Sequence, residues 1–158
     1  MNVQYINPFI EASKTVLKEV AGIDITLGKI YVKTSPYTSS NVVIIVGITG
    51  TIKGQAVFSI DKATACKIAS VMMMGSPVNE LDEMAKSALS ELGNMIMGNT
   101  ATVFYGKGLK IDITPPTLLT GDNLQFSLNK LTTVSIPLNL SVGGIMEIDI
   151  SFIENTQN

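Results

Sequence analysis

The 158-residue sequence contains no histidine and a single cysteine, Cys66. These absences exclude Ser-His-Asp and Cys-His nucleophile systems, acid–base catalysis by imidazole, and zinc sites built from cysteine and histidine. Carboxylates, amides, hydroxyls and lysines are the side chains left for chemistry. We therefore predict no zinc site of the cysteine–histidine kind, and any catalytic role must fall to acids, amides, hydroxyls or lysines.

Charged residues are also scarce. They make up 15% of the chain, against about 25% in an average soluble domain. The formal net charge is −2 and the pI is about 5.0. The scattered lysines form no basic stripe that could neutralise phosphates, so no nucleic-acid partner is predicted. So neutral a surface indicates that another subunit or a partner covers part of it.

Long apolar runs are missing as well. The longest, residues 42–48, is interrupted by Gly47 and is far shorter than the roughly 18 residues of a membrane-spanning helix. The opening MNVQYINPFIEASK lacks the basic start and apolar core of a signal peptide. One cysteine allows no disulfide within the chain, which fits a reducing compartment. We therefore predict a protein without a membrane span, located in the cytoplasm.

The periodicity of the apolar residues predicts three helices. The first covers residues 7–20, with Pro8 near its first position and Gly22 ending it. Asp61 is the predicted N-cap of the second helix. The third and longest helix is predicted at residues 80–105, with Asn79 as its N-cap and acids in its first turn.

Alternating and β-branched residues predict strands in the remainder. One strand is expected within residues 23–33, a pair within residues 42–60, and a β-rich stretch after the third helix. Gly143 and Gly144 mark a hairpin turn in that last stretch. A hydrophobic fraction of 46% provides enough apolar material for a sizeable core, and 158 residues suit one domain.

The sequence also repeats itself. IDIT at residues 23–26 recurs at residues 111–114, and TIKGQAVFSI from Thr51 aligns with SVGGIMEIDI from Ser141. Both halves therefore read as a helix, a strand and a glycine-turned hairpin. We predict a single domain, 1–158, containing pseudo-repeats at about 7–61 and 80–153. The fold class is α/β of the α+β kind, with helices packed on one mostly antiparallel sheet.

The third predicted helix carries the residues that could perform chemistry. Polar and small side chains form one strip beside its apolar stripe, in which Glu91 and Asn94 are three residues apart and so about 5–6 Å apart at Cβ. An acid and an amide there offer a charged acceptor beside a group that both donates and accepts hydrogen bonds. Pro116 follows Asn94 by 22 residues. The full strip is Glu83, Ser87, Glu91, Asn94 and Gly98.

This pattern resembles the CheC/CheX/FliY chemotaxis phosphatases. Their signature is Asp or Ser, three residues, Glu, two residues, Asn, and a proline about twenty-two residues on, which Ser87, Glu91 and Asn94 match here. The spacing allows Pro115 or Pro116 as the proline. The opening NVQYINPFIEA and the segment ALSELGNMIMGN resemble CheX most, and the likeness covers essentially the whole chain.

The resemblance implies an enzyme that removes phosphate from the phospho-aspartate of a CheY-like response regulator. Asn94 would orient the attacking water and Glu91 would pair with the regulator's lysine, with Ser87, Gly98 and Pro116 as contact residues. The regulator would supply Mg²⁺, so no cofactor of the protein's own is implied. By analogy with CheX the protein would be a homodimer.

The first predicted helix carries a weaker version of the same pattern. Asn7 and Glu11 are followed by Lys14 where asparagine is needed, and Pro36 comes 22 residues after Lys14. We therefore predict an inactive copy there and one site per chain. A non-catalytic adaptor in a chemotaxis or flagellar motor assembly is the alternative reading, and a regulator outside chemotaxis is another possible substrate.

Overall fold

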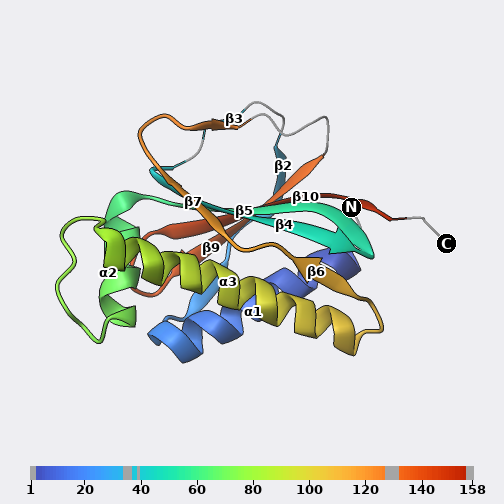
Figure 1. Ribbon diagram of the computed structural model, residues 1–158, viewed down its shortest axis with the longest axis horizontal. Helices are drawn as coiled ribbons and strands as arrows, with labels where there is room; N and C mark the ends of the chain where they lie inside the picture. The colour runs from blue at the N-terminus through green and yellow to red at the C-terminus, as the bar shows by residue number, and fades with distance from the viewer. Residues whose placement is uncertain (1–2, 34–36, 39, 127–131, 156–158) are drawn as a thin grey trace.

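The protein was analysed as a computed structural model, which describes residues 3–33, 37–38, 40–126 and 132–155 (Figure 1). Its helices are α1 (Val3–Ala21), α2 (Lys62–Met72) and α3 (Glu83–Gly106). Asp61 caps α2 as predicted, because its side chain accepts a hydrogen bond from the Thr64 amide at 2.7 Å. Gly22 has a φ of +61° and ends α1, also as predicted.

The start of α1 differs from the prediction. The helix begins at Val3 rather than at residue 7, so Pro8 lies inside it. Proline in a helix interior costs about 3 kcal/mol. The helix propensity of the neighbouring residues alone does not offset this cost. Tyr5 is buried between the rings of Phe104 and Phe152, with centroid distances of 6.4 and 5.5 Å. This long-range packing stabilises the turn that precedes the proline.

The start of α3 was also predicted wrongly. The helix begins at Glu83, and its N-cap is Asp82, whose side chain accepts a hydrogen bond from the Ala85 amide at 2.8 Å. Asn79 is therefore not the cap. Glu80 is instead held by Lys62, with 2.7 Å between Oε2 and Nζ, and Leu81 packs against the core before the helix begins.

Two long hairpins form the centre of the main sheet. The first is β4 (Val42–Gly50) with β5 (Ile52–Ile60), and the second is β9 (Thr133–Leu140) with β10 (Ile145–Glu154). Both were predicted, including the turn at Gly143 and Gly144, which have φ of +91° and +86°. β5 and β10 pair antiparallel along their whole lengths and so join the hairpins.

Short strands complete both edges of this sheet. β1 (Ile25–Leu27) and β2 (Tyr31–Lys33) pair with β9, while β6 (Ile111–Ile113) and β7 (Thr117–Thr120) pair with β4. The predicted strand at residues 23–33 is thus broken into two. β3 (Tyr37–Thr38) and β8 (Gln125–Phe126) form a separate two-stranded sheet.

The strand order is β1-β9-β10-β5-β4-β6, and it has a twofold character. β1 and β2 of the first predicted half pair with β9 of the second half, and β6 and β7 of the second half pair with β4 of the first. Neither half therefore completes its part of the sheet alone. This order supports the internal duplication predicted from the sequence, which we keep as a proposal. The sheet is antiparallel in every pairing of the described residues, as expected for the predicted α+β class.

The helices cover one face of the sheet (Figure 1). Side chains alternate along each strand, and on β10 Ile148 and Ile150 belong to the core shared with the helices. α1 and α3 lie side by side on this face. Asp149, between the two isoleucines in sequence, faces the opposite side of the sheet and is also fully buried.

The central strands approach each other closely at Gly54 of β5, which lies opposite Phe152 of β10. A Cβ atom at Gly54 would lie 1.9 Å from the Ser151 carbonyl oxygen and 2.6 Å from the Phe152 Cα. Both are backbone atoms, so no side-chain movement relieves the clash. Glycine is therefore required where the two hairpins join.

We expect Gly54→Ala to lower the free energy of unfolding by about 3 kcal/mol, because the central strands must separate to admit the methyl group. Urea denaturation measures this change. Gly106→Ala is the matched control, since an added Cβ there meets no atom within 4 Å. Equal stability of the two variants would contradict the required close approach.

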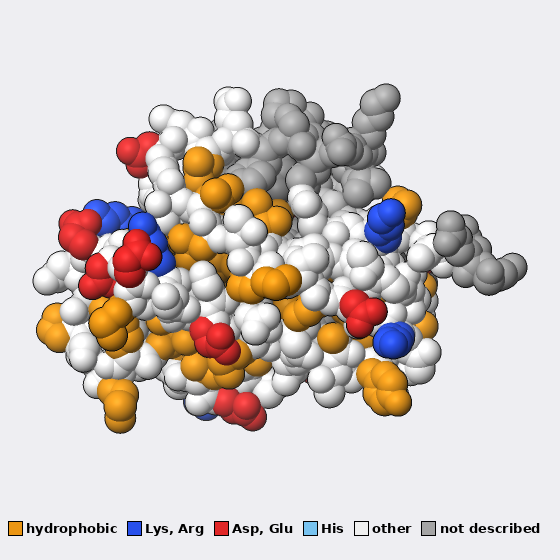
Figure 2. Space-filling view, viewed as in Figure 1, with side chains coloured by type: hydrophobic (Ala, Val, Ile, Leu, Met, Phe, Trp, Pro, Cys, Tyr) orange, Lys and Arg blue, Asp and Glu red, His pale blue; other side chains and the backbone are white. Residues whose placement is uncertain are grey.

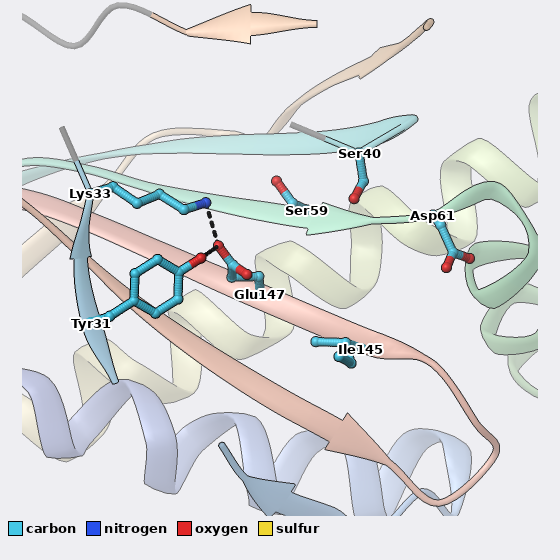
Figure 3. A pocket seen from close by; sticks show the side chains of 7 residues that line it. All are labelled: Tyr31, Lys33, Ser40, Ser59, Asp61, Ile145 and Glu147. Carbon is cyan, nitrogen blue, oxygen red and sulfur yellow. Dashed lines mark hydrogen bonds and ion pairs between the residues drawn. The ribbon is translucent and has the colours of Figure 1, made fainter. Parts of the chain in front are cut away.

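On the face of the sheet away from the helices, a network of charged and polar side chains links β2 to β10 (Figure 3). Lys33 of β2 forms ion pairs with Glu147 and with Asp149, the latter at 3.1 Å. Glu147 Oε1 also accepts a hydrogen bond from the Tyr31 hydroxyl at 2.8 Å. Glu147 is partly buried, which favours its neutral form, but hydrogen bonds from Lys33, Ser135 and Tyr31 outweigh this and lower its pKa.

Ser135 lies between the two carboxyls of this network. Its Oγ lies 2.5 Å from Glu147 Oε1 and 2.6 Å from Asp149 Oδ1. A hydroxyl has one hydrogen, so the two carboxyls share this single donor. Burial raises the pKa of Asp149 because it disfavours the charged form.

We expect Lys33→Met to destabilise the protein by about 3 kcal/mol at pH 7.5, because two carboxyls lose their shared cation. Without Lys33, the pKa of Asp149 in the folded state rises further above its unfolded value, and the pKa of Glu147 is no longer held as low. The folded state of the variant then binds protons more tightly. Its loss of unfolding free energy relative to the wild type therefore becomes smaller as the pH falls toward 5.

Urea denaturation of the variant and the wild type at both pH values measures this effect. Lys53→Met is the control, because Lys53 is an exposed strand lysine that forms no ion pair within the described residues. If the variant loses the same amount of unfolding free energy at both pH values, Lys33 stabilises the fold by packing and not by its charge.

Candidate functional site

A groove of about 410 Å³ lies between α3 and β7. One wall is the exposed side of α3, and the other comes from the chain segment that leads into β7. The residues that line this α3–β7 groove are Glu83, Lys86, Ser87, Ser90, Glu91, Asn94, Pro116 and Leu118.

The burial of α3 fixes which of its side chains reach the groove. Its buried residues, among them Leu89, Leu92 and Ile96, recur at three- and four-residue steps and face the core. Gly93 brings the helix close to the sheet, since a Cβ there would lie 2.9 Å from Cγ2 of Ile44 on β4. Ser87, Glu91 and Asn94 are consequently exposed on the outer side of the helix.

Glu91 and Asn94 have no partner within the described part of the chain: their side chains form no hydrogen bond and no ion pair there. The nearest ion pair along the groove joins Lys86 and Glu83 at 3.8 Å. A carboxylate and an amide are therefore free to bind groups of another molecule. Because both project from a rigid helix of 24 residues, their relative geometry is fixed before any partner arrives.

The opposite wall is held by Thr114. Its amide donates to the Gly47 carbonyl at 3.0 Å, and its hydroxyl accepts from the Gly47 amide at 2.8 Å. These two bonds anchor the start of the Pro115-Pro116 segment on β4. Pro116 lines the groove whereas Pro115 is exposed and does not, so Pro116 is the proline that faces Asn94 across the groove.

Most of the predicted strip reaches the groove, and Gly98 does not. Gly98 is half-buried on α3, one turn beyond Asn94, and an added Cβ there would meet no atom within 4 Å. The space beside it is open to an approaching molecule. Asn7, Glu11 and Lys14 of the predicted inactive copy are exposed on α1, while Pro36 lies outside the described residues.

Three groove residues were missed by the sequence analysis. Ser90 lies four residues before Asn94 and Lys86 four before Ser90, so the helical period could have added both. Leu118 could not have been found this way, because it enters the groove only through the pairing of β7 with β4, where it lies opposite Ile44.

A second pocket, of about 350 Å³, lies on the opposite face of the sheet (Figure 3). Its lining includes Tyr31, Lys33 and Glu147, which pair with one another in the network described above. Charges that neutralise each other this way stabilise the sheet and leave little to attract a ligand. The α3–β7 groove, whose acid and amide are unpaired, is therefore the better candidate site.

Two structural findings bear on metals and membranes. The described residues contain no group of three or more cysteine, aspartate or glutamate side chains placed to hold a metal ion. Within the same part of the chain, no helix has both the length and the hydropathy needed to span a bilayer.

Comparison with known proteins connects this chain to a family. The family model described as chemotaxis phosphatase CheX matches residues 42–139. The chain is 34% identical over 149 residues to the CheY-P phosphatase CheX of Thermotoga maritima, an alignment that covers 94% of this chain and 93% of that protein.

Solved structures with the same fold extend over nearly the whole chain. CheX from Desulfovibrio desulfuricans superposes with a TM-score of 0.84 at 25% identity, covering 96% of this chain and 99% of that one. CheX in the CheX–CheY–BeF3–Mg²⁺ complex from Borrelia burgdorferi gives a TM-score of 0.81 at 31% identity, covering 95% and 98%. The sequence match and the shared architecture agree, and the chain belongs to the CheX family of chemotaxis phosphatases.

Proposed function

We propose that this protein hydrolyses the phospho-aspartate of a CheY-like response regulator, using Glu91 and Asn94. The observation that carries the proposal is a pair of side chains on the outer face of α3, opposite Pro116, that have no partner among the described residues of this CheX-family chain. A relative has been solved in complex with CheY, BeF3 and Mg²⁺. We extend that pairing of proteins to the present chain.

Asn94 is the residue that we assign to the attacking water. Its amide both donates and accepts hydrogen bonds, so it holds a water molecule in line with the bond between phosphorus and the aspartyl oxygen. The water oxygen bonds to phosphorus, the aspartate leaves as a carboxylate, and the water proton passes to the released phosphate. An amide is no base at neutral pH, so Asn94 acts by positioning, which is the dominant contribution in phosphoryl transfer.

Glu91 is assigned to holding the regulator. An exposed helical carboxylate that pairs with no cation among the described residues is suited to an ion pair with a lysine of the partner protein. The three-residue spacing puts that ion pair about one helical turn from Asn94. Ser87, Gly98 and Pro116 surround these two residues as contact positions, of which Gly98 leaves room for close approach.

We further infer that Mg²⁺ enters with the regulator as part of the substrate. The described residues of this chain offer no acidic cluster for the ion, and the phosphatase contributes only the acid and the amide. A homodimer in the cytoplasm stays a prediction from the family resemblance and the composition. The non-catalytic adaptor is the competing function, and the first experiment below separates the two.

We expect Asn94→Ala to slow regulator dephosphorylation at saturation at least tenfold, a change equal to about 1.4 kcal/mol of barrier. The measurement is the decay of a phosphorylated CheY-type regulator with wild type, with the variant and without added protein. Asn7→Ala, an exposed asparagine on α1, is the matched control. Equal decay rates in all three reactions would exclude catalysis and favour an adaptor.

We expect Glu91→Ala to raise KM at least tenfold with a smaller effect on kcat, because the variant loses an ion pair to the partner. Steady-state kinetics over a range of phospho-regulator concentrations separate the two constants. Glu11→Ala on α1 is the control, since Glu11 is equally an exposed helical glutamate. A fall in kcat at unchanged KM would assign Glu91 to the chemical step instead.

A further inference from the structure

Two methionines are exposed on α3 on either side of Glu91 along the helix. Met84 is 67% exposed and Met95 is 36% exposed. Neither lines the α3–β7 groove. Thioether side chains of this size gain nothing from contact with water, and a pair on the same helix face as an unpartnered acid and amide indicates a surface that another protein covers.

The helical period places the methionines on the far side of Glu91 from the groove. At 3.6 residues per turn, Met84 and Met95 lie about 20° and 40° from Glu91 around the helix axis. Ser87 and Asn94 lie about 40° and 60° from Glu91 in the opposite direction. Glu91 therefore occupies a ridge, with the groove on one side and the methionines on the other.

Apolar groups consequently border the polar pair on both sides. Across the groove these are Pro116 and Leu118, and beyond the ridge they are Met84 and Met95. Figure 2 shows hydrophobic side chains exposed over α3 with only scattered charges between them. A small ligand seated in the groove would not reach over the ridge, whereas a protein docked on Glu91 and Asn94 covers both sides. Along the helix the two methionines are about 16 Å apart, which suits a protein footprint.

We propose that Met84 and Met95 form the second half of the docking surface for the response regulator and determine its affinity without taking part in the chemistry. This inference rests on the proposed function, because the regulator is the partner that Glu91 and Asn94 would hold. Apolar contacts around a polar pair exclude water from it. In the resulting lower dielectric, the ion pair of Glu91 becomes stronger than it would be on an open surface.

Methionine also suits this position for a conformational reason. Its unbranched side chain has three rotatable bonds and adapts to surfaces of different shape. The rigid part of the site is then the helix with its acid and amide, and the adaptable part is the pair of methionines beside them.

The test is the double variant Met84→Ser/Met95→Ser, measured in two ways. Steady-state dephosphorylation of a phosphorylated CheY-type regulator should show KM raised roughly tenfold and kcat changed less than twofold. Calorimetric titration with the same regulator, activated by beryllofluoride and Mg²⁺, should show Kd raised by a similar factor. Met74→Ser is the matched control, because Met74 is 97% exposed in the turn after α2 and should change neither constant.

Each outcome decides between the two proposals. Unchanged KM and Kd in the double variant, with an active wild type, would overturn the role of the methionines and leave the proposed function intact. A fall in kcat at constant KM would also overturn it, since the methionines would then act in the chemical step. A wild type that neither binds the activated regulator nor accelerates decay would overturn the proposed function itself, and this inference with it.

Discussion

The antiparallel pairing of β5 with β10 is the interaction on which the rest of this structure depends. It is the only contact between the two hairpins in the order of the described main sheet, and it brings two backbones together at Gly54 without room for a Cβ atom. Because the pairing fixes the centre of the sheet, it also fixes the surface on which α1 and α3 pack. The candidate site is built on that surface, although none of its residues belongs to β5 or β10.

The site combines a rigid wall with an anchored one. The core face of α3 and the contact between Gly93 and Ile44 hold the helix, while the two hydrogen bonds between Thr114 and Gly47 hold the segment before Pro116. Both anchors are on β4. The distance between Asn94 and Pro116 is therefore controlled by one strand. The polar side chains of the groove need no hydrogen bonds to one another to keep their positions. This arrangement leaves the acid and the amide unpaired without destabilising the fold, since both face solvent.

The sequence was most informative where function depends on local spacing. Ser87, Glu91 and Asn94 share one helix, so their common face follows from the helical period, and the amphipathic pattern predicted that helix to within a few residues. The helix starts were predicted less well, because Tyr5 is stabilised by aromatic rings distant in sequence and because Asp82 is the N-cap in place of Asn79. The network of Lys33, Glu147 and Asp149 was not predicted at all. It depends on the pairing of β2, β9 and β10, which no local pattern specifies, although the alternation of acids and isoleucines in β10 shows which residues share a face.

The exchange of edge strands between the two halves has a consequence for how this protein acquires its groove. α3 and β7 belong to the second half of the chain, yet both are anchored on β4, which belongs to the first. No fragment containing only the signature helix and its proline has the strand that sets their separation. The groove thus requires contacts between segments that are distant in sequence. A complete groove therefore needs segments from both halves of the chain, and the second half cannot acquire it alone.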